Sequence, residues 1–292
     1  MNEAQGRALL YGGAMVIVVG LCAASMLYRP EPDVYTLLSS ADVQLRMAYA
    51  IPAVDKQGVS LSARDEMIAD AQKNLDLVEQ IKPGMACTAE FRGFVHMLRG
   101  EPKQAAATYA EARRCQDCTA EQADVLTFNQ ARMLAEAGDI DAALQVFSVN
   151  AARLDSRFGT QRNLEEASML RRVGRVQEAE QRVDGVVAGG AVDAMSWLQA
   201  GREYLELGKS DKAERALTSA QADVPIANYY LARLKLVAGD VDRALALLET
   251  ATAAVPGDAR RLLREEAEVW QGIATDVRFE QLQTPRAATP GR

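Results

Sequence analysis

A pattern of glycine, alanine and a large side chain recurs five times along the chain. Each glycine is followed five residues later by an alanine, and four residues after that by a large apolar or aromatic residue. Successive glycines lie 38, 36, 34 and 31 residues apart. Periods of this length are typical of repeat proteins, in which each copy is one unit that stacks on its neighbours. The five sets are Gly100, Ala105 and Tyr109; Gly138, Ala143 and Phe147; Gly174, Ala179 and Val183; Gly208, Ala213 and Leu217; and Gly239, Ala244 and Leu248.

The pattern continues upstream of each glycine. Four residues before it, three copies carry a large residue, whereas His96 and Lys235 break that column. A glycine without a Cβ suits a tight turn, and small residues let two helices approach closely. The pattern therefore predicts antiparallel helical hairpins, with helices of about 12–15 residues. Small residues stand seven positions before the glycines, at Gly93, Ala131, Ala167, Gly201 and Ala232.

One copy carries the most specific motif. It reads Trp197-x-x-Ala200-Gly201-x-x-Tyr204, then Ala213-x-x-x-Leu217 and Pro225. This motif resembles the tetratricopeptide (TPR) family, and the likeness extends over residues 86–256. A degenerate sixth copy keeps Ala71, Leu75 and Pro83 at the same offsets, with 34–50 as its first helix. The resemblance implies an all-α fold: an α-solenoid of about six TPR-like hairpins over 34–280, a capping helix at 258–280, and a flexible tail at 281–292.

The resemblance also implies a binding surface. In this family the first helix of each hairpin lines a concave groove in which partner segments lie. Arginine pairs with carboxylates, and apolar neighbours supply affinity. We therefore expect a groove for an acidic, partly hydrophobic segment of a partner protein. Projecting the family's first helix onto this chain gives a groove-facing row of positions thirteen, ten, six and three residues before each turn glycine, which includes Met195. The binding residues that we expect on this row are Phe94, Phe128, Arg132, Arg171, Arg202, Tyr229 and Arg233. The alternative is that the arginines form salt bridges with Glu136, Glu165 and Glu206, which contribute little when exposed.

The beginning of the chain is strongly apolar. Residues 8–28 contain no charged side chain, and at about 1.5 Å per residue they could span a bilayer core of about 30 Å. We expect residues 1–28 to form a short tail and one transmembrane helix, and 29–33 a linker. The alternative is a cleaved secretion signal, because Ala23 and Ser25 fit the small-x-small rule. The sequence thus predicts a bacterial single-pass membrane protein whose soluble part is extracytoplasmic, in the periplasm.

The cysteines form one short motif. Cys115-Gln116-Asp117-Cys118 is a CxxC without a following histidine or a second pair, which argues against haem attachment and a four-thiolate zinc site. Cys87 begins the first helix of the same expected hairpin. Antiparallel packing would bring it near the end of the partner helix, so we expect a disulfide from Cys87 to Cys115 or Cys118. Reduced thiols and redox catalysis are the alternatives.

The remaining residues offer little catalytic chemistry. The chain has one histidine, His96, and lacks a phosphate-binding glycine loop, a serine elbow and metal-spaced carboxylates. Its net charge of −7 disfavours nucleic acid. We expect no enzymatic activity, cofactor, metal or small-molecule substrate. The prediction is a protein-binding scaffold that assembles or stabilises a membrane-associated complex. The alternatives are an accessory factor for exported or newly synthesised client proteins and, third, a thiol-redox enzyme.

Overall fold

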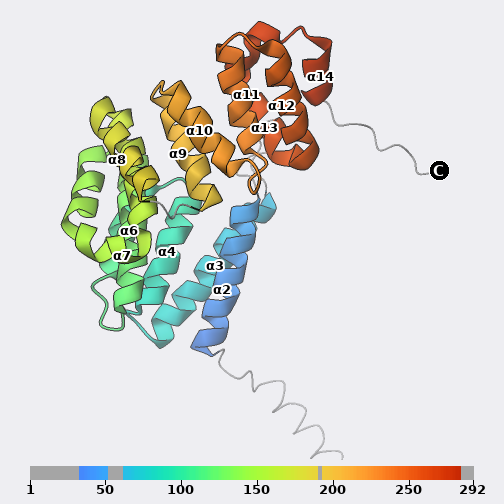
Figure 1. Ribbon diagram of the computed structural model, residues 1–292. Helices are drawn as coiled ribbons and strands as arrows, with labels where there is room; N and C mark the ends of the chain where they lie inside the picture. The colour runs from blue at the N-terminus through green and yellow to red at the C-terminus, as the bar shows by residue number, and fades with distance from the viewer. Residues whose placement is uncertain (1–32, 52–61, 190–192, 284–292) are drawn as a thin grey trace, which may run out of the picture. The chain divides into compact units, whose positions relative to one another are not determined.

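The computed structural model describes residues 33–51, 62–189 and 193–283 of the 292-residue chain. Every regular element in these ranges is a helix (Figure 1). The chain divides into two compact units, Met1–Arg99 and Gly100–Arg292. The two units are described separately below.

The first unit contains three described helices, and α2 and α3 pack together as a hairpin. Apolar residues recur at helical spacing on the facing sides, so the hairpin buries one continuous stripe. Leu45 of α2 and both Ala71 and Leu75 of α3 are fully buried. Ala71 and Leu75 are the residues that marked the degenerate repeat. The helices are α2 (Val34–Ala50), α3 (Ser62–Ile81) and α4 (Ala86–Leu98).

The second unit is a run of packed antiparallel helices (Figure 1). Helix α6 packs on α7, α7 on α8, α9 on α10, and α11 on α12. Three short segments follow α12 and close the run. The elements are α5 (Pro102–Ala112), α6 (Ala120–Glu136), α7 (Ile140–Arg172), α8 (Val176–Ala188), α9 (Ala194–Glu206), α10 (Ser210–Ala220), α11 (Ala227–Val237), α12 (Val241–Ala254), α13 (Pro256–Glu265), the 3-10 helix η1 (Ala267–Ile273) and α14 (Val277–Gln283).

The five repeated glycines are turn residues, as the sequence predicts. Their φ angles are all positive, from 70° at Gly208 to 89° at Gly138. At four of the turns the residue after the glycine donates its N–H to the carbonyl four residues before the glycine, as in Asp139 N to Leu134 O at 2.9 Å. This is the Schellman closure of a helix end. Lys235 supplies such a carbonyl at 2.9 Å from Asp240 N, so this backbone role is kept where the side-chain column is broken.

The repeated alanines and large residues form the core. All five alanines that follow the turn glycines are fully buried, and all five large partners are buried too. The closest approach lies between α9 and α10. A Cβ added at Gly201 would stand 2.6 Å from Cγ of Leu217, well inside van der Waals contact. The repeated pattern is therefore a packing pattern, as the sequence indicates.

Two expectations about helix boundaries were wrong. The second helix of one repeat and the first helix of the next form a single helix, α7, of 33 residues. Residues 140–172 contain no proline to stop the helix, and Gly159 is accommodated inside it. The expected capping helix at 258–280 is instead divided into α13, η1 and α14. Helix α14 runs to Gln283, so the first residues of the expected tail are helical.

The assignment as a single-pass membrane protein is corrected. Within the described ranges, no helix combines the length and the apolar composition needed to cross a bilayer. Helix α7 is long enough, but it carries charged residues such as Arg153, Asp155 and Arg157 along its middle turns. The segment 8–28, on which the prediction rested, lies outside the described residues. The membrane anchor and the extracytoplasmic location inferred from it are therefore not supported.

Candidate partner-binding face

Two helices of the second unit present a similar exposed stripe. On α9, Met195 and Arg202 are exposed together with Gln199 and Glu206, at spacings of three and four residues. On α6 the corresponding stripe contains the half-buried Phe128 and the exposed Arg132. Residues at these spacings share one side of a helix. We call these stripes on α6 and α9, together with the exposed side of the second half of α7, the binding face.

Arg132 and Glu165 form an ion pair on this face. Nε of Arg132 lies 3.3 Å from Oε1 of Glu165 on α7, and both side chains are partly exposed. Burial raises the pKa of Glu165, while the charge of Arg132 acts in the opposite direction. The pair therefore offsets part of the desolvation of this carboxylate, and it ties α6 to α7.

Arg171 is also engaged within the protein. Its Nε donates to Oε2 of Glu203 at 3.0 Å, which joins the end of α7 to α9. Both side chains are mostly buried, so the contact is better shielded from solvent than the pair at Arg132. Glu203 stands five residues before a turn glycine and lies outside the row of positions from which the face was predicted.

Arg202 has different surroundings. Its guanidinium carbon lies 5.0 Å from the centroid of the Tyr230 ring, which is a cation–π contact between α9 and α11. In the part of the chain that the structure describes, no ion pair joins Arg202 to a carboxylate. The aromatic ring positions the guanidinium without consuming its hydrogen-bond donors, so these N–H groups remain available to a partner carboxylate.

Arg233 and Tyr229 hold the end of the helical run together. Arg233 lies 3.1 Å from both Glu206 and Glu266, and its side chain is only 17% exposed. The Tyr229 hydroxyl donates to Glu266 at 3.1 Å and accepts from Nε1 of Trp270 at 3.0 Å. Tyr229 is fully buried, and this burial raises the pKa of its hydroxyl. The structure thus places both residues in contact with the C-terminal segment, where Tyr229 has no surface to offer a partner.

The two phenylalanines of the expected groove lie in different units. Phe128 of α6 is half-buried, with its ring centroid 5.4 Å from that of Phe147 and 5.3 Å from that of Phe158. Phe94 belongs to the first unit, where its ring centroid lies 6.0 Å from that of Tyr49. The structure therefore gathers Phe128, Arg132, Arg171 and Arg202 in the second unit. Their role in binding remains a hypothesis.

Sequence reasoning missed the residues that decide which arginines are engaged. Glu266 follows the last repeat, so no repeat offset could have indicated it. Tyr230 stands next to the expected Tyr229, and it is Tyr230 that faces Arg202. Met195 was not missed, because it stands thirteen residues before a turn glycine, on the groove-facing row that the sequence predicts, and it is 52% exposed. Its exposed thioether adds apolar surface to the stripe that carries Arg202.

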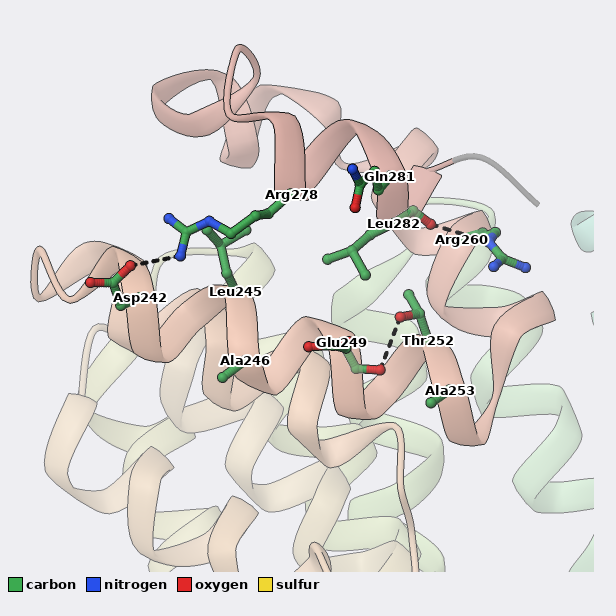
Figure 2. Close-up of a pocket in the computed structure, with 10 residues that line it drawn as sticks. All are labelled: Asp242, Leu245, Ala246, Glu249, Thr252, Ala253, Arg260, Arg278, Gln281 and Leu282. Atoms are coloured by element: carbon green, nitrogen blue, oxygen red, sulfur yellow. Dashed lines mark hydrogen bonds and ion pairs between the residues drawn. The ribbon is translucent and has the colours of Figure 1, made fainter. Parts of the chain in front are cut away.

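A hollow of about 460 Å³ lies between α12 and α14 (Figure 2). At one end Arg278 reaches across to Asp242 at 2.8 Å, and at the other end Nε of Arg260 donates to the Leu282 carbonyl at 3.1 Å. Leu245 and Leu282 supply apolar lining. These two contacts join α14 to α12 and to α13, so we interpret the hollow as the seam that attaches α14. Within the described residues, no three histidine, cysteine or acidic side chains are grouped to hold a metal ion.

The cysteines also fall in both units. Cys87 lies in the first turn of α4, in the first unit, whereas Cys115 and Cys118 are the end residues of the turn between α5 and α6. Cys115 Sγ lies 3.8 Å from the Glu111 carbonyl oxygen, and Cys118 Sγ lies 3.6 Å from that of Thr119. The disulfide expected from Cys87 to one of these two residues stays a prediction.

Comparison with known proteins agrees with this fold. Models of the tetratricopeptide repeat match residues 125–147 and 198–259. No curated protein matches the sequence. Similar solved structures include the APC/C hetero-tetramer Cut9-Hcn1, with a TM-score of 0.54 and 16% identity over 81% of this chain. This chain spans only 43% of that one.

Two further structures match over most of their own length. PilW, a type IV pilus biogenesis factor, has a TM-score of 0.53 and 12% identity over 76% of this chain and 98% of its own. The C-terminal part of a TPR repeat-containing protein from Cytophaga hutchinsonii has a TM-score of 0.52 and 15% identity, over 84% and 92%. At these identities the likeness concerns the fold alone.

Proposed function

The chain is a tetratricopeptide-repeat protein, and we propose that it is an adaptor that holds an acidic, partly apolar segment of a partner protein on the binding face of α6, α7 and α9. The TPR fold implies a protein–protein interaction scaffold. The proposal adds where the partner lies and what chemistry it carries.

The surroundings of Arg202 carry this proposal. Three of the four arginines expected to bind a partner already contact carboxylates of the protein: Arg132, Arg171 and Arg233. Arg202 instead rests on an aromatic ring with exposed donors. A guanidinium held in this way pairs readily with a carboxylate, because part of the cost of ordering the side chain has already been met.

The neighbours of Arg202 indicate the rest of the partner segment. Met195 is exposed on the same side of α9, and Phe128 and Val125 are half-exposed on α6. Exposed apolar groups beside a positioned arginine are typical of surfaces where apolar contact supplies affinity and a charge pair supplies orientation. We therefore infer that the segment presents an acidic residue to Arg202 and apolar side chains to its neighbours.

Site-specific cross-linking tests the location. A photoreactive phenylalanine derivative replaces Gln199, which is exposed beside Arg202, or Thr218, which is exposed on α10. We expect cross-linked partners at position 199 and few at position 218. The cross-linked segments should be enriched in acidic and apolar residues. Equal cross-linking at the two positions would count against the face.

Charge reversal tests the chemistry. R202E should abolish the cross-link at position 199, because two like charges would then face each other. R215E is the matched control, since Arg215 is exposed on α10 of the same hairpin and reverses the same charge. Loss in both variants, or in neither, would contradict the role given to Arg202.

The stoichiometry of the captured material separates two functions. One partner in stoichiometric amount supports an adaptor in the assembly of a protein complex, which we favour because the engaged arginines leave one defined attachment point. Many partners in small amounts would instead support an accessory factor that engages client proteins.

A further inference from the structure

The CxxC motif occupies a turn of defined geometry. Cys118 N donates to the Cys115 carbonyl at 3.1 Å, so residues 115–118 form a hydrogen-bonded β-turn. The Cα atoms at the ends of such a turn lie within about 7 Å of each other. Disulfides join residues whose Cα atoms are about 4.4–6.8 Å apart. The backbone between α5 and α6 therefore holds the two cysteines at a separation that a disulfide can bridge.

The two cysteines differ in their electrostatic surroundings. Cys118 directly precedes Thr119, the N-cap of α6, whose Oγ1 accepts from Gln122 N. It therefore lies at the positive end of that helix. Cys115 follows α5 and lies near the Glu111 carbonyl at the negative end of its helix. A thiolate is favoured at a helix N-terminus. Each sulfur also lies within 3.8 Å of one backbone carbonyl, so the helix ends, and not these carbonyl contacts, distinguish the two cysteines.

Arginine side chains add to this difference. Burial lowers the pKa of the Arg113 guanidinium and Arg153 lowers it further, whereas Cys118 acts in the opposite direction. Arg113 and a thiolate at Cys118 therefore attract each other. Arg113 is fixed in place by donating to Oε1 of Gln130 on α6 at 2.8 Å. Arg153 of α7 is engaged separately, by an ion pair with Asp124 and a hydrogen bond to Thr127 at 2.9 Å, so we assign the attraction to Arg113.

We propose that Cys115 and Cys118 form a redox-active pair, in which Cys118 is the attacking thiolate and Cys115 the resolving thiol, and that low-molecular-weight disulfides oxidise it. This pairing differs from a bridge to Cys87, and it does not depend on the binding face. Oxidation closes the four-residue turn covalently and so fixes the connection between α5 and α6.

The reaction is a thiol–disulfide exchange in two steps. The Cys118 thiolate attacks one sulfur of the small disulfide, forms a mixed disulfide and releases one small thiolate. Cys115 then loses its proton to water and attacks Sγ of Cys118, which expels the second thiolate. In total, two protein thiols lose two electrons and two protons, and one small disulfide is reduced to two thiols.

Peptide mapping identifies the pair. The full chain carries C22S, which removes the fourth cysteine of the sequence, Cys22. It is equilibrated with graded ratios of reduced and oxidised glutathione, quenched in acid, alkylated and cleaved with trypsin. Cys115 and Cys118 fall in one tryptic peptide, 115–132, and Cys87 falls in another. We expect the 115–132 peptide to lose two hydrogens as the ratio becomes oxidising, while Cys87 stays alkylated. A bridge to Cys87, or no bridge under oxidising ratios, would overturn the proposal.

Single variants test the assigned roles. C115S should accumulate one glutathionyl group on Cys118, whereas Cys115 in C118S should react several-fold more slowly. R113Q should slow alkylation of Cys118 several-fold. R114Q removes the same charge from an exposed neighbour and should have the smaller effect. Equal rates for the two cysteines, or equal effects of the two arginine changes, would show that the assigned asymmetry is wrong.

Discussion

Arg202 and Arg233 occupy the same position in consecutive repeats, six residues before a turn glycine, but the two regions use them differently. On α9 the arginine lies on an aromatic ring and keeps exposed donors. On α11 it is held by Glu206 and Glu266, and the C-terminal segment covers the helix beside it. The comparison shows that the repeat fixes where a side chain stands. The neighbouring element decides whether that side chain remains available to a partner.

The largest expected effect is a loss of stability in the C-terminal segment, η1 and α14, which covers α11 and has no counterpart beside α9. Trp270 is 1% exposed and contacts both Tyr229 and Phe279. W270A should lower the free energy of unfolding by about 3–5 kcal/mol, because it leaves a large cavity and removes the donor to the Tyr229 hydroxyl. Urea unfolding followed by far-UV circular dichroism measures the loss. W197A on α9 is the control. An equal loss of stability in W197A would show that the C-terminal segment is not a special source of stability.

The next effect concerns the close contact inside the regular hairpin. G201A should cost about 1–3 kcal/mol, since the added Cβ would overlap Leu217 and force α9 and α10 apart. A Cβ added at Gly257, in α13, would meet no atom within 4 Å, so G257A should be neutral or slightly stabilising. Thermal unfolding of both variants compares them. If G201A were also neutral, the two helices would be packed less tightly than described.

Neutralising the two equivalent arginines tests the comparison directly. R233Q should lower the free energy of unfolding by about 1.5 kcal/mol, because it leaves Glu206 and Glu266 without their cation. R202Q should cost less than about 1 kcal/mol, since it removes one exposed cation–π contact. Partner binding should show the reverse order, with the larger loss for R202Q. The same ranking in stability and in binding would contradict different uses of the two positions.

The last effect, smaller than that expected for R233Q, concerns how the two helices begin. Asp193 caps α9: its Oδ1 accepts from Ser196 N at 2.9 Å, and its Oδ2 accepts from the Ser196 hydroxyl at 2.6 Å. Helix α11 begins at Ala227, and its N-cap residue, Ile226, provides no side-chain hydrogen bond. D193A should therefore cost about 1 kcal/mol at neutral pH.

This cap also has a defined pH dependence. The hydrogen bonds from Ser196 lower the pKa of Asp193 in the folded protein. The carboxylate therefore contributes its stability above the pKa of the unfolded chain, about 3.9, and loses it as pH falls through the lower folded value. Unfolding curves at neutral and acidic pH should show the D193A difference shrinking on acidification. A constant difference would mean that the charge is not involved.

Much of the fold could be predicted because the repeat pattern is a packing pattern. Gly138, Ala143 and Phe147 illustrate this: one closes a helix end, one allows close approach and one fills the space between helices. The same offsets could not predict that α7 is continuous. A helix continues wherever no residue stops it, and the pattern marks turns only where a glycine stands.

The candidate face was less predictable than the fold. Residue offsets placed Arg202 and Arg233 correctly on equivalent helix positions, but the contacts of a long side chain depend on what the next element supplies. Tyr230 and Glu266 could not be assigned this way, because one lies off the repeated row and the other follows the last repeat. Tyr229 satisfied the offset and yet is buried, since the C-terminal segment covers it.

The unbroken helix α7 has a mechanical consequence. It packs against both α6 and α8, and at 33 residues it is about 50 Å long. Neighbouring repeats joined by a loop can flex at that loop, whereas the two repeats that meet in α7 share one continuous helix. Bending them apart would break helical hydrogen bonds in the middle of α7. Arg132 pairs with Glu165 of α7 and Arg171 belongs to the same helix, so one continuous helix sets the spacing between these two arginines. In the proposed function, the partner segment would have to match that spacing.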